Sequence, residues 1–507
     1  MNEFDLAVVG SGVGLSLIEA ALQRGLTCAL VEEGKFGGTC LTRGCIPSKI
    51  LVQPADLIRE AAHAAKIGLD FQLAGLDWSA IGQRMWRKID GSKGIETSLS
   101  GMAGLTVFKG TGEFTGPLEM RVTAHNGTEA GEFRAKRFIL AAGARSFVPP
   151  VEGLEKAGYV TSETFFGSKF PVKPWKSLVI LGGGAIGAEF AHIFSAFGTR
   201  VKIVEMQPHL LSTEEEEIRE HLETQFRAFG IEVLTSHRAV SARPAANGKV
   251  LTLYNEVTGE TRELACEEIL VSSGIRSNAD RLHVEKAGIA TDARGWIVTD
   301  EYLQTSVPGI WALGDINGKY QFRHKANYEA AVLAGNLFGK ISNPTRRKVN
   351  YDTVPWAVFT CPQIAHLGLT ETQARKKAQE RGERLMVGYN RYSAIGKGYA
   401  MGYEPGDPDD GFVKLITDEH LKILGVHIVG PQASVLIQPF VYLMNAGFTC
   451  TAPEQESRAG KIQGILQEPA IHCLDTETID PIYESMAIHP ALSELAAWVI
   501  GNLKWRG

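Results

Sequence analysis

The chain has 507 residues, too many for a single hydrophobic core, so we expect three or four domains. Hydrophobic residues make up 44% and charged residues 21% of it, which is typical of globular proteins, and the formal net charge of -5 offers no basic surface for nucleic acid. No uncharged apolar run is long enough to cross a bilayer, which argues against a membrane role.

The chain begins with an apolar run at residues 6–9, and no signal peptide precedes it, so we expect a cytoplasmic protein. It contains seven cysteines, an odd number for a chain expected to lie among reduced thiols. That count favours a catalytic cysteine pair over a framework of structural disulfides.

The first glycine-rich turn lies directly after the apolar run at residues 6–9. Residues 5–10 predict a buried parallel strand, residues 15–24 a helix, and residues 27–31 a second strand that ends at Glu32. The glycines of such a turn let a pyrophosphate approach the helix N-terminus, and the acid binds ribose hydroxyls. The third glycine of a G-x-G-x-x-G pattern falls on Leu15, and Gly14 substitutes for it if the turn is one residue shorter. The expected contacts are Gly10, Gly12, Gly14 and Glu32.

Two cysteines stand five positions apart in the run Cys40-Leu-Thr-Arg-Gly-Cys45-Ile-Pro-Ser-Lys49. Thiols at this spacing can close a small ring that is opened and remade during turnover. A helix that starts after Cys45 predicts a lowered pKa for that thiol and a favoured thiolate.

The second glycine-rich turn matches the full pattern. A predicted strand at residues 178–181 leads into Gly182, Gly184 and Gly187, and a further strand at residues 201–204 ends at Glu205. An acid at this position binds the adenosine ribose and repels a 2′-phosphate, and the next residues carry no positive charge. The sequence therefore predicts NAD in preference to NADP.

Four consecutive glutamates occupy residues 214–217, after Thr213. Threonine is a good N-cap, and acids in a first turn complement the helix dipole. We predict a solvent-exposed helix start here, in preference to a metal site or a partner surface.

The last motif is Ala487-Ile-His489-Pro-Ala-Leu-Ser-Glu494. A histidine titrates near neutral pH and can carry the proton of a thiol. Glu494, five residues further on, is placed to orient the imidazole of His489.

In this order the motifs resemble the class I pyridine nucleotide–disulfide oxidoreductases, and among them dihydrolipoyl dehydrogenase most. The resemblance extends to residues 138–145, 271–278, 305–315 and 324–330. It implies an α/β fold with two Rossmann-like dinucleotide-binding domains, for FAD and NAD, and a C-terminal α+β dimerisation domain. The expected domains are 1–150 (FAD, with the redox disulfide), 151–278 (NAD), 279–345 (return of the FAD-binding domain) and 346–507 (dimerisation, with the catalytic histidine and an insertion near 449–478).

The resemblance also assigns roles. Cys40 meets the substrate sulfur, Cys45 lies nearer the flavin, Lys49 lies beside the flavin, and His489 moves the proton with Glu494 behind it. No metal is expected. The further cofactor contacts that it implies are Gly143, Asp315, His324 and Gly274. In this family the histidine serves the disulfide of the partner subunit, which implies a homodimer.

The implied enzyme is an FAD-dependent dihydrolipoyl dehydrogenase that oxidises a protein-bound dihydrolipoyl group through Cys40 and Cys45 and reduces NAD⁺. Its partner is then a lipoyl-carrier protein or a small disulfide substrate. Three alternatives stay open: a reductase of another small disulfide that resembles mycothione reductase, a flavin NADH oxidase or transhydrogenase without thiol chemistry, and a scaffold with degenerate sites.

The chain has more residues between Gly447 and His489 than this family normally uses, and the excess lies near residues 449–478. Two interpretations stay open for this insertion: a surface elaboration, or a segment that shapes access to the disulfide. Cys450 and Cys473 flank it, and a second redox pair there also stays open.

Overall fold

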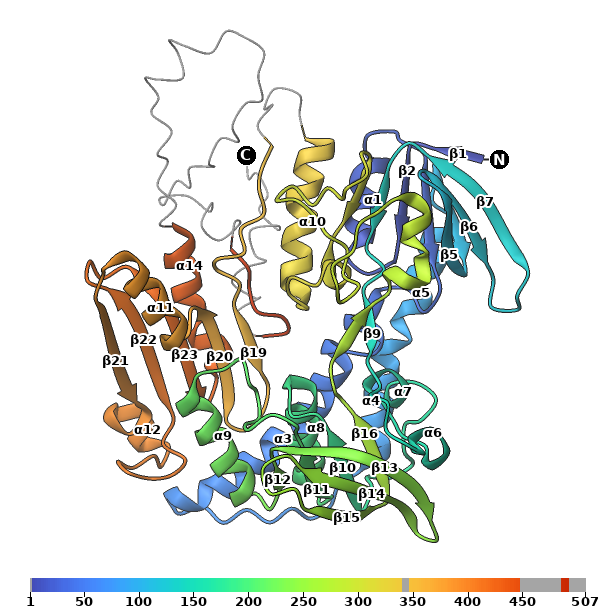
Figure 1. The fold of residues 1–507 in the computed structure, drawn as a ribbon. Helices are drawn as coiled ribbons and strands as arrows, with labels where there is room; N and C mark the ends of the chain where they lie inside the picture. The colour runs from blue at the N-terminus through green and yellow to red at the C-terminus, as the bar shows by residue number, and fades with distance from the viewer. Residues whose placement is uncertain (1, 340–345, 447–484, 492–507) are drawn as a thin grey trace, which may run out of the picture.

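We analysed a computed structural model of the chain, which describes residues 2–339, 346–446 and 485–491. The predicted fold class is confirmed: two Rossmann-like domains and a C-terminal dimerisation domain (Figure 1). The predictions for the 449–478 insertion, Cys450, Cys473 and Glu494 lie outside the described residues. Within the described residues, no helix has the length and apolar character needed to cross a membrane.

The first Rossmann domain is built on a parallel sheet whose strands are buried on both faces. Leu6 and Val8 point toward the helices, while Ala7 and Val9 point toward a second sheet, as the two-residue period of a strand requires. The parallel sheet has the order β18 (Ile310–Ala312), β8 (Phe138–Leu140), β2 (Leu6–Val9), β3 (Cys28–Glu32) and β4 (Leu105–Lys109). Helices α1 (Gly14–Leu22) and α10 (Arg323–Phe338) cover one face, and β1 (Asn2–Phe4), β7 (Glu129–Ala135), β6 (Glu119–Thr123) and β5 (Thr111–Gly116) cover the other.

The second Rossmann domain repeats the design with fewer strands. Its parallel sheet has the order β12 (Glu232–Leu234), β11 (Arg200–Val204), β10 (Ser177–Leu181) and β16 (Glu268–Val271). Helices α8 (Ala185–Ala196) and α9 (Glu216–Ala228) pack with it. An antiparallel sheet, inserted in the chain between β12 and β16, also packs against it and is formed by β13 (His237–Ala245), β14 (Gly248–Asn255) and β15 (Thr261–Cys266). The chain passes between the two domains through β9 (Ala144–Ser146) and β17 (Ile275–Ser277), which pair with each other.

The cysteine-bearing segment bridges the two Rossmann domains. It forms α2 (Gly38–Thr42) and the long α3 (Cys45–His63), and α3 packs against α8, with Leu51 and Val52 in the same core as Phe190. Helices α4 (Trp78–Ile89) and α5 (Gly91–Ser100) continue the chain from there, and the short α6 (Leu154–Ala157) and α7 (Ser162–Phe165) follow β9.

The C-terminal domain is an antiparallel sheet with helices beside it, drawn in orange in Figure 1. Its order is β19 (Trp356–Val358), β20 (Gln363–Gly368), β23 (Ile423–Gly430), β22 (Phe412–Asp418) and β21 (Leu385–Arg391). The helices are α11 (Glu371–Arg381), α12 (Gly396–Ala400), α13 (Ala433–Leu436) and α14 (Gln438–Ala446).

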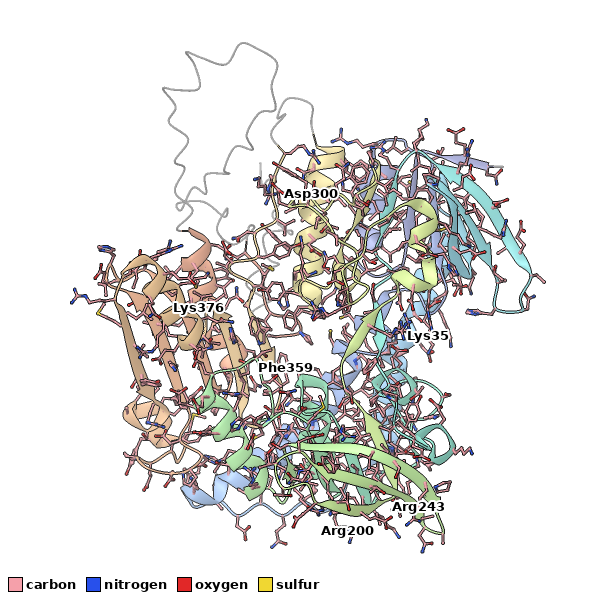
Figure 2. The ribbon with its side chains drawn as sticks, in the orientation of Figure 1. Lys35, Arg200, Arg243, Asp300, Phe359 and Lys376 are labelled. Carbon is pink, nitrogen blue, oxygen red and sulfur yellow. The ribbon has the colours of Figure 1, made fainter. Side chains whose placement is uncertain are left out.

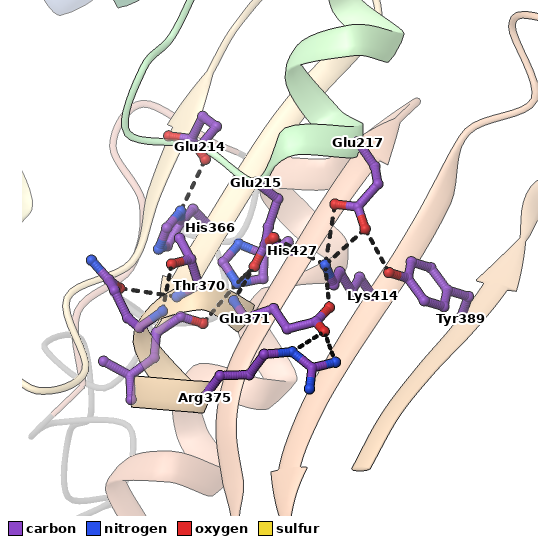
Figure 3. Close-up of polar contacts among 12 residues, drawn as sticks. Glu214, Glu215, Glu217, His366, Thr370, Glu371, Arg375, Tyr389, Lys414 and His427 are labelled. Atoms are coloured by element: carbon purple, nitrogen blue, oxygen red, sulfur yellow. Dashed lines mark hydrogen bonds and ion pairs between the residues drawn. The ribbon is translucent and has the colours of Figure 1, made fainter. Parts of the chain in front are cut away.

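The four-glutamate run ties the second Rossmann domain to the C-terminal sheet, so the prediction of a solvent-exposed helix start was wrong. Glu214 and Glu215 are only 5% and 4% exposed, and α9 begins at Glu216 with Glu215, not Thr213, as its N-cap. Figure 3 shows their partners: Glu214 lies 2.9 Å from His366 Nδ1, and Lys414 Nζ lies 2.9 Å from Glu215 and 3.0 Å from Glu217. Buried carboxylates need such partners, and here they come from β20 and β22, about 150 to 200 residues further along the chain.

Candidate active site

A cavity of about 440 Å³ runs through the first Rossmann domain from the glycine-rich turn to the cysteine pair. The predicted residues that line it are Gly10, Gly12, Glu32, Cys40, Cys45, Gly143 and Asp315. At Gly143, φ is +66° and no atom lies within 4 Å of where a β-carbon would stand, so bare backbone borders the open space. An elongated cavity that starts at a helix N-terminus and ends at a thiol pair fits a flavin dinucleotide.

Asp315 supplies a carboxyl group to the wall of this cavity, directly after β18. Burial raises its pKa to about 6, although the positive charge of Lys325 opposes the shift. The fully buried Lys325 donates to the carbonyl of Gly314 and to Glu329, and Glu329 also accepts the N–H of Gly314. This network fixes the backbone that carries Asp315.

The first glycine-rich turn is fixed by its own acid. Glu32 Oε2 accepts hydrogen bonds from the backbone N–H and the hydroxyl of Ser11, at 2.8 and 2.6 Å. Helix α1 begins at Gly14, where a β-carbon would lie 2.6 Å from Val8 Cγ1. Gly14 thus allows helix and strand to approach closely, and so takes the part of the third glycine of the pattern, which falls on Leu15.

The second turn is arranged in the same way. Glu205 Oε2 accepts the N–H of Gly183 at 2.6 Å, and its other oxygen accepts the N–H of Gln207 at 2.8 Å. Gly187 lies inside α8, where a β-carbon would come within 2.0 Å of the Gly182 carbonyl. Gly274 lies between β16 and β17, and its carbonyl accepts the N–H of Phe147.

The two cysteines lie at the end of the cavity, Cys40 within α2 and Cys45 as the first residue of α3. Both sulfurs are present as thiols. The pKa of Cys45 is raised well above its usual value, first by a hydrogen bond with Cys40 and then by burial, while Lys49 and His489 act in the opposite direction. The predicted lowering of this pKa is therefore wrong for the dithiol state, because the neighbouring sulfur and burial both raise it.

His489 completes the cluster. Its Nε2 lies 3.1 Å from Cys40 Sγ, and the donor atoms of Cys40, Cys45 and His489 all lie within 4.8 Å of one another. This contact is made within the one chain of the structure, and the assignment of His489 to the partner subunit's disulfide stays a prediction.

His324 lies behind His489 and is not among the described residues that line the flavin-sized cavity. Its Nε2 lies 2.6 Å from the carbonyl oxygen of Pro355, and its Nδ1 lies 3.5 Å from the backbone nitrogen of His489. Burial lowers the pKa of His324 to about 4, so the ring is neutral, with a proton on Nε2 and a lone pair on Nδ1 that accepts the N–H of His489.

Lys49 lies one turn into α3 and forms an ion pair that the sequence analysis missed. Its Nζ donates to both carboxylate oxygens of Glu189 in α8, at 2.9 and 2.7 Å, and lies 4.3 Å from the ring centroid of Phe359. Figure 2 labels Phe359 where the C-terminal domain meets the other two domains, and its N–H also donates to Glu189. The signal in the sequence that could have revealed this ion pair is Glu189, the single acid in the apolar helix after the second glycine motif.

The site can therefore exchange a disulfide with a dithiol, because it holds two adjacent sulfurs, a proton carrier and an open cavity together. The Pyr_redox_2 model, described as pyridine nucleotide-disulphide oxidoreductase, matches residues 4–330, and the dimerisation-domain model of that family matches residues 354–456. The latter supports a homodimer.

Among curated proteins, mycothione reductase of Mycobacterium tuberculosis is 35% identical over 461 residues, covering 89% of this chain and 94% of that protein. Dihydrolipoyl dehydrogenase of Chlamydia muridarum is 32% identical over 507 residues, covering 98% and 96%. A similar solved structure is the Cu(II) complex of the HOCl-induced flavoprotein disulfide reductase RclA from Escherichia coli, with a TM-score of 0.74, 26% identity and coverage of 90% and 98%. The chain thus belongs to the class I pyridine nucleotide-disulfide oxidoreductases, a family of flavoprotein enzymes that implies FAD and a pyridine nucleotide.

Proposed function

We propose that this protein is an FAD-dependent dihydrolipoyl dehydrogenase that oxidises a protein-bound dihydrolipoyl group and reduces NAD⁺. The observation that carries the proposal is the cluster of Cys40, Cys45 and His489 at the end of the cavity. Oxidation of a dithiol needs an electrophilic disulfide and a group that accepts protons, and the cluster supplies both once its two thiols are oxidised.

The thiol chemistry balances within the cluster. One substrate thiolate attacks Cys40 in the Cys40–Cys45 disulfide, a mixed disulfide forms, and Cys45 leaves as a thiolate. The second substrate thiol gives its proton to His489 and displaces Cys40, which leaves a substrate disulfide and the enzyme dithiol. A bound flavin supplies the two-electron carrier between this dithiol and NAD⁺.

Glu205 is the reason for proposing NAD⁺. Both of its oxygens already accept N–H groups of the turn, which fixes the carboxylate in place to bind a ribose diol. Its negative charge opposes a 2′-phosphate, and the adjacent Met206 and Gln207 offer no positive charge to balance one.

The test measures NAD⁺ reduction by dihydrolipoamide and by a dihydrolipoylated carrier domain, with NADP⁺ as the comparison. We expect turnover with NAD⁺ and a loss on the order of a thousandfold or more in Cys45→Ser. Cys361→Ser is the matched control, because this thiol is half-buried and lies outside the cavity lining. Normal turnover in Cys45→Ser would overturn the thiol chemistry.

The second candidate is an NADH-dependent reductase of a small disulfide, favoured by the match to mycothione reductase over 89% of this chain. Rapid NADH oxidation with mycothione disulfide, together with little turnover of dihydrolipoamide, would select it. NADH oxidation that survives in Cys45→Ser without any disulfide would instead point to an oxidase or transhydrogenase.

A further inference from the structure

We propose that Glu214, His366 and His427 bind a divalent transition-metal ion, for which Zn²⁺ is the probe. All three side chains are buried, and one donor atom from each lies within 4.8 Å of the other two. Two imidazole nitrogens and one carboxylate oxygen, with water as the fourth ligand, are a set that Zn²⁺ accepts in a tetrahedral site. From the sequence alone we expected no metal ion and a solvent-exposed helix start at residues 214–217.

The three ligands come from separate segments of the chain. His366 on β20 and His427 on β23 occupy paired positions of neighbouring antiparallel strands, and their ring centroids are 4.3 Å apart. Glu214 approaches them from the second Rossmann domain, just before α9 (Figure 3). Its Oε2 lies 2.9 Å from His366 Nδ1. Two domains therefore meet at this group of side chains.

The hydrogen bonds of both imidazole rings leave Nδ1 as the atom for the metal. His366 Nε2 donates to the carbonyl of Gly368 at 3.0 Å. His427 Nε2 donates in the same way to the carbonyl of Leu369, the next residue, at 2.9 Å. Metal-binding histidines almost always donate their other ring N–H to such a partner, which orients the ring and fixes its tautomer.

His427 Nδ1 is a buried lone pair without a use in the metal-free protein. This atom has no hydrogen-bond partner among the described residues, although the side chain is completely buried. Burial lowers the pKa of His427 well below its usual value, and the neighbouring His366 adds to this effect. The ring is therefore neutral, with its proton on Nε2. A buried acceptor left unpaired costs free energy, and a metal ion removes that cost.

The carboxylate ligand is oriented as well. Trp356 Nε1 donates to Glu214 Oε1 at 2.7 Å, which leaves Oε2 facing His366. The indole of Trp356 also stacks on the His366 ring, with centroids 3.6 Å apart. Each of the three ligands thus has an outer partner that orients it, as the ligands of metal sites do.

The nearby lysine leaves Glu214 available for the ion. Lys414 Nζ pairs with the three other acids of this junction, Glu215, Glu217 and Glu371, at 2.9, 3.0 and 2.9 Å. Glu214 faces His366 instead, so its negative charge is directed at the metal site.

Binding exchanges a proton for the metal ion. In the metal-free protein, His366 Nδ1 donates a proton to Glu214 Oε2. The ion takes the place of this proton, so about one proton is released for each ion bound. A tetrahedral ion with bonds of about 2.0 to 2.2 Å holds its ligands about 3.4 Å apart, so the third nitrogen has to move by about 1.4 Å at most.

The bound ion joins the second Rossmann domain to the C-terminal domain. The segment that carries Glu214 is also attached to the second glycine-rich turn, because the N–H of Leu211 donates to the carbonyl of Gly183 at 3.0 Å. The metal site therefore stabilises the packing of the nucleotide-binding turn against the sheet of β20 and β23.

The deciding experiment is a calorimetric titration of the flavin-loaded, metal-stripped protein with Zn²⁺. All samples carry Cys40→Ser and Cys45→Ser, because these thiols and His489 are a second group that can hold a metal ion. We expect one ion per chain, and a dependence of the heat on the buffer that shows the release of about one proton. The absence of stoichiometric binding would overturn the proposal.

Substitutions locate the bound ion. His366→Ala and His427→Ala each remove a ligand, so we expect Zn²⁺ binding to weaken by about a hundredfold or more. Trp356→Phe keeps a ring to stack on His366 but removes the donor to Glu214, and we expect about tenfold weaker binding. His420→Ala, which removes an exposed histidine of the same domain, should bind like the protein with all its histidines. Unchanged binding in both His366→Ala and His427→Ala would overturn the proposal.

Thermal unfolding gives a second readout. Zn²⁺ should raise the melting temperature of the His420→Ala protein but not that of the His366→Ala protein, because only a bound ion stabilises the folded state. An equal rise in both would place the ion elsewhere and overturn the proposal. Glu214→Gln, which keeps an acceptor for Trp356, replaces His366→Ala if that variant does not fold, and the same loss is expected. Neither readout depends on turnover, so both decide the metal site whether or not the protein oxidises dihydrolipoamide.

Discussion

The two glycine-rich turns begin in the same way. Gly10 and Gly182 have φ values of +103° and +106°, and a β-carbon on them would lie 2.4 Å from the Ala141 carbonyl oxygen and 2.5 Å from that of Ser272. Glu32 and Glu205 each fix their turn through its backbone N–H groups. In both domains, then, the same sequence pattern of a glycine and an acid gives the same turn.

The turns then differ in what surrounds their second glycine. Gly12 lies against the start of α2, and a β-carbon on Gly38 would come within 2.6 Å of Gly12 Cα. At Gly184 no atom lies within 4 Å of where a β-carbon would stand. The first turn is therefore also a packing surface for the cysteine-bearing segment, whereas the second is left open for its nucleotide.

The largest effect is expected from Gly187→Ala in the second turn. The new β-carbon would lie 2.0 Å from the Gly182 carbonyl oxygen and 2.8 Å from Ser272 Oγ, so the turn has to move. We expect the free energy of unfolding to fall by about 3 kcal/mol or more, with NADH binding lost and flavin content retained. Calorimetry and an NADH titration test this.

Gly184→Ala is the matched control for Gly187→Ala, because open space surrounds that position. Its melting temperature should equal that of the wild type. If Gly187→Ala melted like Gly184→Ala, the helix–strand contact would not be the reason for a glycine at position 187.

The next effect is expected from Gly38→Ala, which tests whether the first turn is also a packing surface. The substitution places a β-carbon against the Gly12 backbone at a φ of +68°. We expect the purified protein to lose most of its flavin, measured as the ratio of flavin to protein absorbance. Gly25→Ala shares the positive φ (+72°) but has no atom within 4 Å, so it should cost only about 1 kcal/mol and keep its flavin. Equal flavin loss in both variants would show that the backbone conformation, not the contact with Gly12, decides the effect.

A smaller effect is expected from Asp315→Asn in the flavin-free protein. Burial raises the pKa of Asp315 from 3.8 to about 6, so the folded state binds an extra proton between these values and loses stability as the pH rises. The Asn variant should be more stable than the wild type at pH 7 by up to about 3 kcal/mol, less whatever solvent in the cavity screens. The difference should close toward pH 4. Urea denaturation across this range measures it, and a difference that does not vary with pH would contradict the raised pKa.

The parts of the structure that follow from neighbours in sequence were predictable. The strand, turn, helix and acid at Gly10 and Gly182 are specified within about 30 residues, and they fold as expected. The same holds for the helix that starts at Cys45.

The parts that depend on distant residues were not predictable. Glu214 and Glu215 look like a solvated helix start until β20 and β22 supply His366 and Lys414. The Cys45 pKa depends on where the Cys40 sulfur lies, and the Lys49–Glu189 pair joins helices that are separated by more than 100 residues. A short sequence window contains none of these partners, and the sign of each electrostatic effect depends on them.

The smallest effect is expected from replacing the two acids by their amides, which tests the likeness of the turns directly. In Glu205, one oxygen accepts the N–H of Gly183 and the other that of Gln207. Glutamine can accept only one of these bonds and turns a donor toward the other. We expect Glu205→Gln to weaken NAD⁺ binding about tenfold and to reduce the discrimination against NADP⁺, because one hydrogen bond to a charged group and the repulsion of a 2′-phosphate are both lost.

Glu32→Gln faces the same conflict, since Glu32 accepts Ser11 through one oxygen and the N–H of Gly34 through the other. Flavin affinity, measured by adding FAD back to the flavin-free protein, should fall by a similar factor. A much larger loss at Glu32 would mean that the first acid also holds the packing between Gly12 and Gly38. The two turns would then differ in the role of their acids as well as in what surrounds their second glycine.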